Sequence, residues 1–315
     1  MVARRPAGNS ANELQARAMG FRALDGMRPI RILLQTTIPF AENDWHVGRF
    51  SLLARELAGV SDAGRRIEVT ARDRASSNDD PVLATIDRSG FDEVWIFGVD
   101  TGNGLTPAEH DALVRFRARG GGLLTARDHQ DLGSCLAKLP GPGSANYFHS
   151  VNLDPAEANR TADDRYTKGV TWPNYHSGKN GDVQRVRAIE PVHPLLRRRD
   201  GSVIEVFPAH PHEGAIGVPA DEAGRVIATG KSLATGREFN LIVAFEGRGD
   251  ASGASLGRAV VESSFHHFVD YNWDTTMGAP AFVDDPEGTS ISRDPRLLED
   301  VKAYARNVAR WLARD

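Results

Sequence analysis

Polar side chains that could move protons follow three of the apolar runs in this sequence. The runs are GLLTA at 122–126, SVIEVFPA at 202–209 and GRAVVESSF at 257–265. Histidine titrates near neutral pH, so histidines grouped with acids suit acid–base chemistry or metal ligation. The residues that follow these runs are Arg127, Asp128, His129, His210, His212, Glu213, His266 and His267.

A catalytic arrangement can be assigned to five of them. One of His266 and His267 is expected to act as base or acid, because adjacent residues on a strand point to opposite faces and only one can face a site. Asp128 or Glu213 is expected to orient that histidine. Arg127 is expected to hold an oxyanion or a carboxylate.

Further polar and aromatic residues are predicted to bind substrate, because ligands of open α/β sheets bind beyond the carboxyl ends of the strands. Capping of the helix that follows is the alternative role for Asp44 and His46. Trp172 and Tyr175 are expected to cover the ligand and exclude water. The predicted binding residues are Glu42, Asp44, Trp45, His46, Asp100, His129, Trp172, Tyr175, His210 and His212.

A metal ion is the alternative use of the histidines. His210 and His212 form an H-x-H pair, and Asp128 or Glu42 could complete a zinc site. The leading expectation is that no cofactor is needed. Cys135 is the single cysteine, and we expect it to be a buried apolar residue in a helix, not a nucleophile.

Predicted strands and helices that could position these residues alternate from residue 30 onward. Apolar runs predict strands at 30–37, 66–73, 92–100 and 122–128, and helical patterns follow at 46–60, 81–90, 106–120 and 131–139. Thr106, Pro107 and Glu109 form a capping box at the start of one helix. Such alternation with solidly apolar strands predicts a doubly wound α/β fold, a mostly parallel sheet with helices on both faces.

The rest of the chain precedes or follows the alternating region at residues 30–139. Residues 140–192 lack a clear period and are predicted to form a lid or insertion. Strands are predicted at 202–210, 224–232, 238–247 and 257–265, before an amphipathic helix at the C-terminus. Residues 1–28 are an arm, either a short amphipathic helix or a disordered terminus. A single domain is expected over 29–315.

Composition narrows the class of protein. The 315 residues are 40% hydrophobic and 25% charged, with a net charge of −4. Scattered arginines, with no basic stripe, argue against nucleic-acid binding, and their excess over lysine is typical of a GC-rich bacterial genome. One cysteine, no secretory signal and no long apolar run lead us to expect a cytoplasmic protein without membrane contact, with a small-molecule substrate and a possible homodimer.

Three motifs carry a family resemblance. They are the GGGLL entry to 122–128, HPLL at 193–196 leading to FPAHPHEG, and GRAVVESSFHH. With them the chain resembles the class I glutamine-amidotransferase-like superfamily, and within it the trehalose-utilisation (ThuA-like) branch. The resemblance implies a flavodoxin-like core and a histidine delivered by the late strand.

The turn after residue 125 departs from the amidotransferase pattern. Depending on the register, Ala126 or Arg127 stands where that family has its cysteine nucleophile. Neither can attack a carbonyl, so thioester chemistry on glutamine is not expected. The ThuA-like branch also lacks that cysteine and is associated with sugars and oxidised sugars.

These observations predict an enzyme that performs hydrolysis or isomerisation on a small polar, carbohydrate-like substrate by His/Asp acid–base chemistry. Two alternatives stay open. One is a metal-dependent hydrolase that uses His210 and His212. The other is a non-catalytic protein that binds a small molecule.

Overall fold

The computed structural model describes residues 28–62, 65–75, 78–163, 169–220, 222–247 and 256–313. The arm predicted at residues 1–28 lies outside these ranges except for Arg28. Within them, no helix is both long and apolar enough to cross a membrane.

A sheet of nine strands runs through the described part of the chain, in the order β2-β3-β1-β4-β5-β13-β12-β11-β8. Its strands are β1 (Ile30–Thr36), β2 (Ser61–Asp62), β3 (Arg65–Arg72), β4 (Glu93–Phe97), β5 (Gly122–Ala126), β8 (Arg187–Ala188), β11 (Arg225–Lys231), β12 (Glu238–Phe245) and β13 (Ala259–Glu262).

Five neighbouring strands of this sheet are parallel. β3, β1, β4, β5 and β13 pair in parallel, and the outer strands pair antiparallel on both sides. Numbered along the chain, the parallel strands have the order 2-1-3-4-5, which is the flavodoxin-like order. The predicted α/β fold class is confirmed, and β1, β3, β4 and β5 lie where the four early strands were expected.

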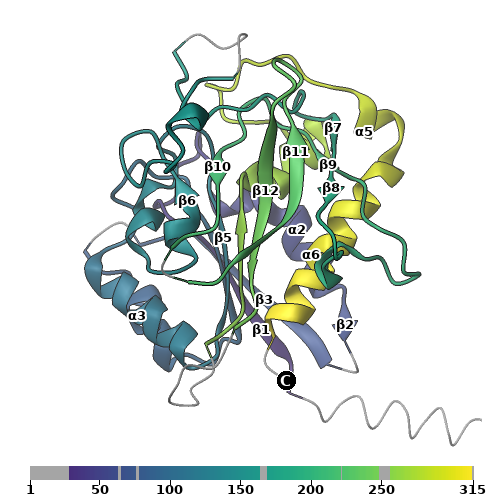
Figure 1. The fold of residues 1–315 in the computed structure, drawn as a ribbon. Coiled ribbons are helices and arrows are strands. Elements are labelled where there is room, and N and C mark those ends of the chain that lie inside the picture. The colour runs from purple at the N-terminus through teal and green to yellow at the C-terminus, as the bar shows by residue number, and fades with distance from the viewer. Residues whose placement is uncertain are drawn as a thin grey trace, which may run out of the picture.

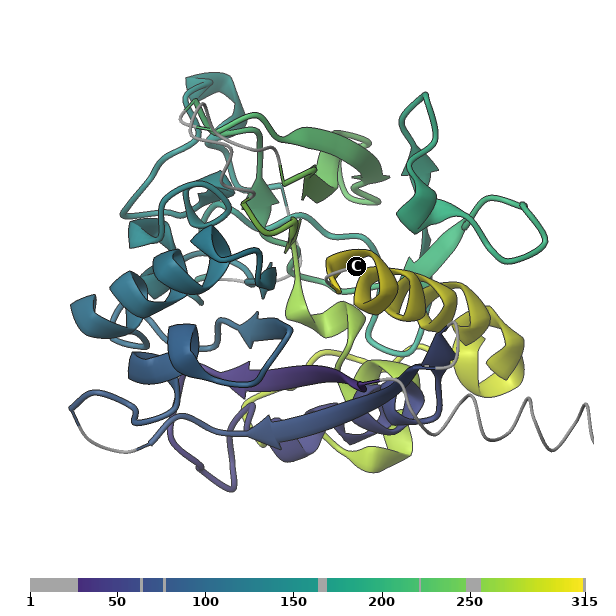
Figure 2. The same cartoon turned by 90° about the horizontal axis from the view of Figure 1, so that it is seen from below.

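Helices cover both faces of the sheet (Figures 1 and 2). Alternate residues of β1 enter two separate cores. Ile32 and Leu34 pack in one core with α2 (Ser51–Ala58) and α6 (Glu299–Leu312), and Leu33 packs in the other with α3 (Pro107–Ala118) and the 3-10 helix η2 (Leu83–Arg88). A strand buried on both faces has to be apolar at every position, which explains the continuous run ILL in β1.

Helix α3 begins as its sequence predicts. The Thr106 side chain accepts a hydrogen bond from the backbone of Glu109, and the Glu109 carboxylate accepts one from the backbone of Thr106. Pro107 occupies the first turn, where its missing N–H costs nothing. The capping box is confirmed.

Three other predicted helices are shortened or divided. The helix predicted at 131–139 is only the 3-10 helix η3 (Ser134–Lys138), which begins after Gly133 in a left-handed conformation. The helix predicted at 46–60 divides into η1 (Val47–Phe50) and α2. The C-terminal helix likewise begins as η9 (Pro295–Leu298) and continues as α6.

The strand predicted at 202–210 lies outside the large sheet. It is reduced to β9 (Val206–Pro208), which pairs with β7 (Val183–Arg185). The physical reason is that β8, from the segment before it, already occupies the free edge of β11. The predicted strands at 224–232, 238–247 and 257–265 are confirmed as β11, β12 and β13.

The segment 140–192 has short elements of its own in its described residues. They are η4 (Gly143–Ala145), β6 (Asn146–Tyr147), η5 (Glu157–Asn159), β7 and β8. β6 pairs with β10 (Ala215–Ile216). Tyr175 exchanges backbone hydrogen bonds with Glu213, and Ser177 donates one to the carbonyl of His210. The segment therefore packs against residues 210–213, which include the predicted site residues His210 and His212.

The last described elements follow β13. They are η7 (Phe265–His267), α4 (Asp270–Trp273), η8 (Thr275–Met277) and α5 (Ser290–Arg293), and η6 (Pro194–Leu196) lies earlier in the chain. Asp270 accepts hydrogen bonds from the backbone of Ser51 and Leu52 at the start of α2. This contact ties the segment after β13 to the helix that covers β1.

Gly214 tests how closely these loops pack. A Cβ at this position would lie 2.6 Å from Asp128 O, Ser263 O and Arg127 Cδ. We expect Gly214→Ala to lower the free energy of unfolding by about 1–3 kcal/mol, because backbone would have to move. Urea unfolding measures this. Gly59→Ala is the control, since its Cβ would meet its nearest atom at 3.4 Å. Equal stability of the two variants would contradict the close packing.

Candidate functional site

A buried carboxylate stands at the centre of the candidate site. Asp128 follows β5 and is 1% exposed. His129 Nδ1 lies 3.1 Å from its Oδ2, His210 Nε2 lies 3.1 Å from its Oδ1, and His266 Nε2 lies 3.5 Å from its Oδ2. We call Asp128, His129, His210 and His266 the Asp128 cluster. Its members come from the carboxyl end of β5, the segment after β9 and η7 after β13, the edge where the fold places ligands.

Asparagines hold the two most buried imidazoles in position. The rings of His210 and His266 are stacked with centroids 3.6 Å apart. His210 Nδ1 lies 3.1 Å from Asn180 Oδ1, and His266 Nδ1 lies 3.1 Å from Asn272 Oδ1. The edge of Trp45 packs against His266 at 4.7 Å between ring centroids. Each ring therefore turns its Nε2 toward Asp128.

His212 lies beside the cluster but belongs to a different pair. Its ring centroid is 5.3 Å from that of His129 and 5.5 Å from that of His210. Its Nε2 lies 3.1 Å from Asp285 Oδ2 and its Nδ1 lies 3.0 Å from Asn174 Oδ1. Both nitrogens of His212 thus have oxygen partners, and this placement gives no support to a metal ion shared by His210 and His212.

The site has one edge that reaches the surface. The side chain of His129 is 22% exposed and that of Asp285 is 25% exposed, whereas Asp128, His210 and His266 are buried. Phe282 is exposed on the same loop as Asp285 and contacts Trp45, with ring centroids 6.4 Å apart. The exposed edge of the site is therefore formed by His129, Asp285 and Phe282.

Charges within the site shift several pKa values. Burial alone would raise the pKa of Asp128, but His210, His129 and His266 hold it well below its usual range. Burial and the neighbouring His266 lower the pKa of His210 well below its usual value, against the opposing effect of Asp128. The hydrogen bond from His212 lowers the pKa of Asp285. Both carboxylates are therefore ionised at neutral pH.

His267 points away from the cluster. It is completely buried, with Nε2 3.3 Å from Glu213 Oε1 and Nδ1 3.1 Å from Glu262 Oε2. Burial alone would lower the pKa of His267, but the charge of Glu213 and its hydrogen bonds to both carboxylates raise it to about 10. Ser177, Ser263 and Gln184 also donate to Glu213, and Tyr304 of α6 donates to Glu262.

The catalytic roles expected of His267 and Glu213 therefore find no support in their placement. Glu213 orients His267, not the histidine that faces Asp128. The side chains of His266 and His267 point in different directions because residues 265–267 form a 3-10 turn.

Arg127 also faces away from a possible substrate. Its guanidinium donates to the carbonyl oxygens of Tyr147, Ala215 and Gln130 and lies 4.1 Å from the ring centroid of Phe148. Burial lowers its pKa to about 9, against the charges of Asp128 and Asp131. Arg127 fastens β6 and β10 to the turn after β5, so it is not placed to hold a substrate anion as expected.

Three of the predicted binding residues lie before α2 and outside the cluster. Glu42 is exposed. The Asp44 carboxylate accepts a hydrogen bond from the backbone of Trp45, and the His46 side chain caps η1 through the backbone of Gly48. The capping role is therefore the one that the structure gives to His46.

Asp100, another predicted binding residue, is bound to Cys135 and not to the Asp128 cluster. Its carboxylate accepts hydrogen bonds from the backbone and the thiol of Cys135. Burial, together with the charge of Asp100, raises the pKa of Cys135 well above its usual value. Cys135 thus stays a buried thiol, as expected, and lies in η3.

Trp172 and Tyr175 are part of the core and do not form a cover. Both are buried, and the ring of Tyr175 is stacked on Phe239 with centroids 4.8 Å apart. Tyr175 is also fixed by the backbone pairing with Glu213. Their segment contributes to the site through Asn174 and Asn180 instead.

Sequence reasoning missed Asn174, Asn180, Asn272 and Asp285 as parts of the site. Asn174 and Asn180 stand in PNYHSGKN, and the concentration of asparagine there was a signal that could have found them. Asp285 stands in an acidic loop outside the predicted strands and helices, so no comparable signal marks it.

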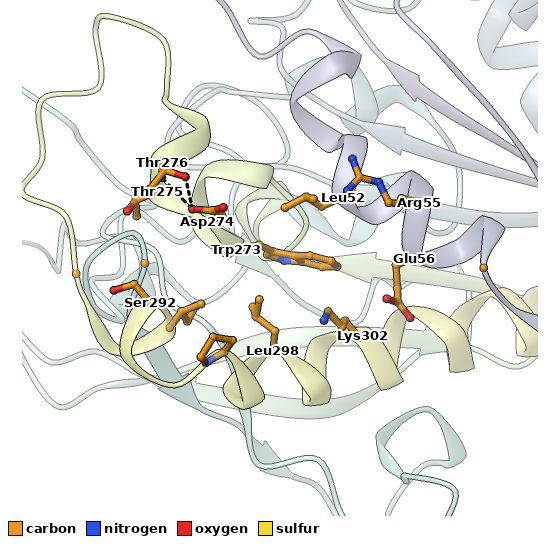
Figure 3. A pocket seen from close by; sticks show the side chains of 15 residues that line it. Leu52, Arg55, Glu56, Trp273, Asp274, Thr275, Thr276, Ser292, Leu298 and Lys302 are labelled. Carbon is orange, nitrogen blue, oxygen red and sulfur yellow. Dashed lines mark hydrogen bonds between the residues drawn. The ribbon is translucent and has the colours of Figure 1, made fainter.

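A cavity of about 710 Å³ lies elsewhere, between α2, α4 and the segment leading into α6 (Figure 3). Trp273 lies between Leu52 of α2 and Leu298 in this view. Among the described residues, no member of the Asp128 cluster lines it. Its titratable side chains are Arg55, Glu56, Asp274 and Lys302, and it contains none of the predicted site residues, so we place the candidate site at the Asp128 cluster.

Comparisons with known proteins give similarity of fold at low identity. No family model and no curated protein match the sequence. The mmIFT52 N-terminal domain is similar with a TM-score of 0.47 and 12% identity, over 90% of this chain and 98% of that one. The exo-β-1,4-mannosidase Op5Man5 from Opitutaceae bacterium strain TAV5 has a TM-score of 0.38 and 12% identity, over 95% of this chain and 38% of that one. The glutaminase domain of Trypanosoma brucei CTPS with bound acivicin has a TM-score of 0.40 and 15% identity, over 83% of this chain and 97% of that one. With TM-scores this low, the site has to be interpreted from its own residues.

The two adjacent histidines give a test of the site. We expect His267→Gln to lower the free energy of unfolding by about 3–5 kcal/mol, because Glu213 and Glu262 lose the charge between them. Thermal or urea unfolding measures the change. His149→Gln, at an exposed histidine, is the control and should change stability by less than about 0.5 kcal/mol. A His267→Gln variant as stable as the control would contradict the structural role.

Proposed function

We propose that this protein is an enzyme that transfers protons on a small polar substrate at the Asp128 cluster, in a hydrolysis or an isomerisation. The observation that carries the proposal is the convergence of three imidazoles within 3.5 Å of one buried carboxylate. Titratable groups with strongly shifted pKa values, gathered at the ligand-binding edge of the sheet, are characteristic of active sites. A polar cluster of this kind favours an enzyme over a binding protein with an apolar pocket.

Asp285 is the proton acceptor in this proposal. Its carboxylate is half-buried, and the pKa-lowering hydrogen bond from His212 keeps it ionised and ready to accept a proton. Asn174 fixes the other nitrogen of His212. In a hydrolysis the proton comes from water, and in an isomerisation it comes from a carbon next to a carbonyl group.

While Asp285 accepts the proton, the Asp128 cluster is proposed to attract an oxygen atom of the substrate. Its imidazole nitrogens converge on one side, and His129 brings that side to the surface. The sequence resemblance to the amidotransferases implies that Ala126 or Arg127 stands at their nucleophile position, so the proposed reaction has no covalent intermediate at the turn. Charge stabilisation and proton transfer carry the reaction instead.

A carbohydrate-like substrate fits the surroundings of the site. Trp45 contacts both His266 and the exposed Phe282, and Phe40 is exposed beside His46. Aromatic rings next to polar groups suit a sugar, which has C–H faces and many hydroxyl groups. The sequence resemblance to the ThuA-like branch, which is associated with sugars and oxidised sugars, points to the same class of substrate.

Asp285→Asn tests the proposed proton acceptor. The amide keeps the shape of the side chain but cannot accept the proton, so kcat should fall by about 10²–10⁴-fold with little change in KM. Asp284→Asn, at the exposed neighbouring carboxylate, is the matched control and should keep full activity.

Activity can be sought in a panel of sugars, oxidised sugars and glycosides. Product analysis detects hydrolysis, and uptake of deuterium from D₂O, followed by NMR, detects isomerisation. Absence of turnover by the wild-type chain across the panel, or equal activity of the two variants, would contradict the proposal.

A further inference from the structure

One buried nitrogen of the Asp128 cluster has no hydrogen-bond partner among the described residues. It is Nε2 of His210, and His210 is 3% exposed. The nitrogen lies 3.1 Å from Asp128 Oδ1, an ion-pair distance, without forming a hydrogen bond of normal geometry. Leaving a buried polar atom unsatisfied costs about 1–3 kcal/mol, so this position calls for a ligand.

The asparagine network decides which nitrogen of His210 carries the proton. Asn272 Nδ2 donates to the carbonyl of Ala209 and to Asn180 Oδ1. Because Asn180 therefore turns its oxygen to this point, His210 Nδ1, 3.1 Å from the same oxygen, must be the donor. His210 then presents the lone pair of Nε2 to Asp128.

A lone pair that faces a carboxylate is satisfied when a cation lies between the two groups. The ring of His266 is stacked on His210 with centroids 3.6 Å apart and addresses the same carboxylate. A metal ion would satisfy the buried Nε2, since it binds an imidazole lone pair and a carboxylate together.

The distances fit such an ion. One nitrogen of His129, one of His210 and a carboxylate oxygen of Asp128 all lie within 4.8 Å of one another. His129 Nδ1 lies 3.1 Å from Asp128 Oδ2, and His210 Nε2 lies 3.1 Å from Oδ1 of the same carboxylate. In a tetrahedral zinc site with bonds of about 2.0–2.1 Å, donor atoms are about 3.3 Å apart. Binding of one ion would therefore draw the three donors together from separations of at most 4.8 Å.

We propose that Asp128, His129 and His210 bind one divalent transition-metal ion of the zinc type. Two imidazoles and a carboxylate are a common donor set for zinc and its first-row neighbours, and three protein ligands leave a position open for water or substrate. Asn180 and the stacked His266 orient His210, as outer partners of metal-bound histidines do. The proposal rests on the proposed function only in sharing its site, where the ion supplies the positive charge that attracts a substrate oxygen.

Metal uptake by the full-length chain tests the inference without any substrate. Protein purified without a metal-affinity column and stripped with EDTA is titrated with Zn²⁺, and Co²⁺ serves as a spectroscopic probe of tetrahedral coordination. We expect one ion per chain in the wild type and at least a 100-fold loss of affinity in His210→Ala. His149→Ala, at the exposed histidine, is the control and should bind as the wild type does.

A second pair of variants separates positioning from folding. Asn180→Ala removes the acceptor for His210 Nδ1 and should weaken Zn²⁺ binding by about 10–100-fold. Asn180→Asp keeps an oxygen acceptor for both His210 and Asn272, so its affinity should stay within a few fold of the wild type. If both variants bind as the wild type does, Asn180 has no positioning role.

The outcomes keep the two proposals apart. A wild-type chain that takes up neither Zn²⁺ nor Co²⁺, or a His149→Ala variant that loses as much affinity as His210→Ala, overturns the metal site. Turnover that continues in EDTA-stripped protein overturns the metal requirement and leaves the proposed function intact. Stoichiometric binding without turnover of any compound in the panel supports the metal site and contradicts the proposed function.

Discussion

The burial of the Asp128 carboxylate is the constraint on which the rest of the site depends. An ionised group that is 1% exposed is costly unless positive charge or hydrogen bonds surround it. Here the surrounding groups are imidazoles, and imidazoles have two nitrogens that both need partners. The outer nitrogens of His210 and His266 turn to Asn180 and Asn272, which brings α4 and the segment after residue 169 into the same assembly.

A second buried network lies next to the first and keeps it in place. His267 bridges Glu213 and Glu262, and Tyr304 connects that bridge to α6. Arg127 performs a similar task on the opposite side by binding three carbonyl oxygens. These two networks hold their charged residues by partners inside the protein, and the exposed edge of the site is left to His129 and Asp285.

The fold class and the sheet edge that carries the site were predictable from the sequence, because periodicity indicates which faces of an element are buried. The continuous apolar runs of β1, β4 and β5 are typical of strands covered on both faces. Asp128, His129, His210 and His266 follow apolar runs and meet at the Asp128 carboxylate, with His212 beside them, although the run before His210 forms only β9, outside the large sheet. The choice between His266 and His267 was out of reach, because it depends on η7 starting at Phe265, where the alternation of a strand no longer applies.

Partners that come from irregular segments could not be predicted in the same way. Asn180 and Asp285 stand in loops, and their roles depend on tertiary contacts that leave no period in the sequence. Trp172 and Tyr175 show the converse error. Their aromatic character suggested a mobile cover, but an aromatic residue in an irregular segment can equally be an anchor, and Tyr175 is fixed against Phe239.

The three-residue turn η7 links ligand binding at the Asp128 cluster to the stability of the protein. Its backbone carries His266, which faces the Asp128 cluster, and His267, which is held by β13 and, through Glu262 and Tyr304, by α6. Whatever ligand restrains His266 also restrains this turn, and with it the packing of the C-terminal helix. By thermodynamic linkage, the resistance of the whole chain to heat then reports on whether its site is filled.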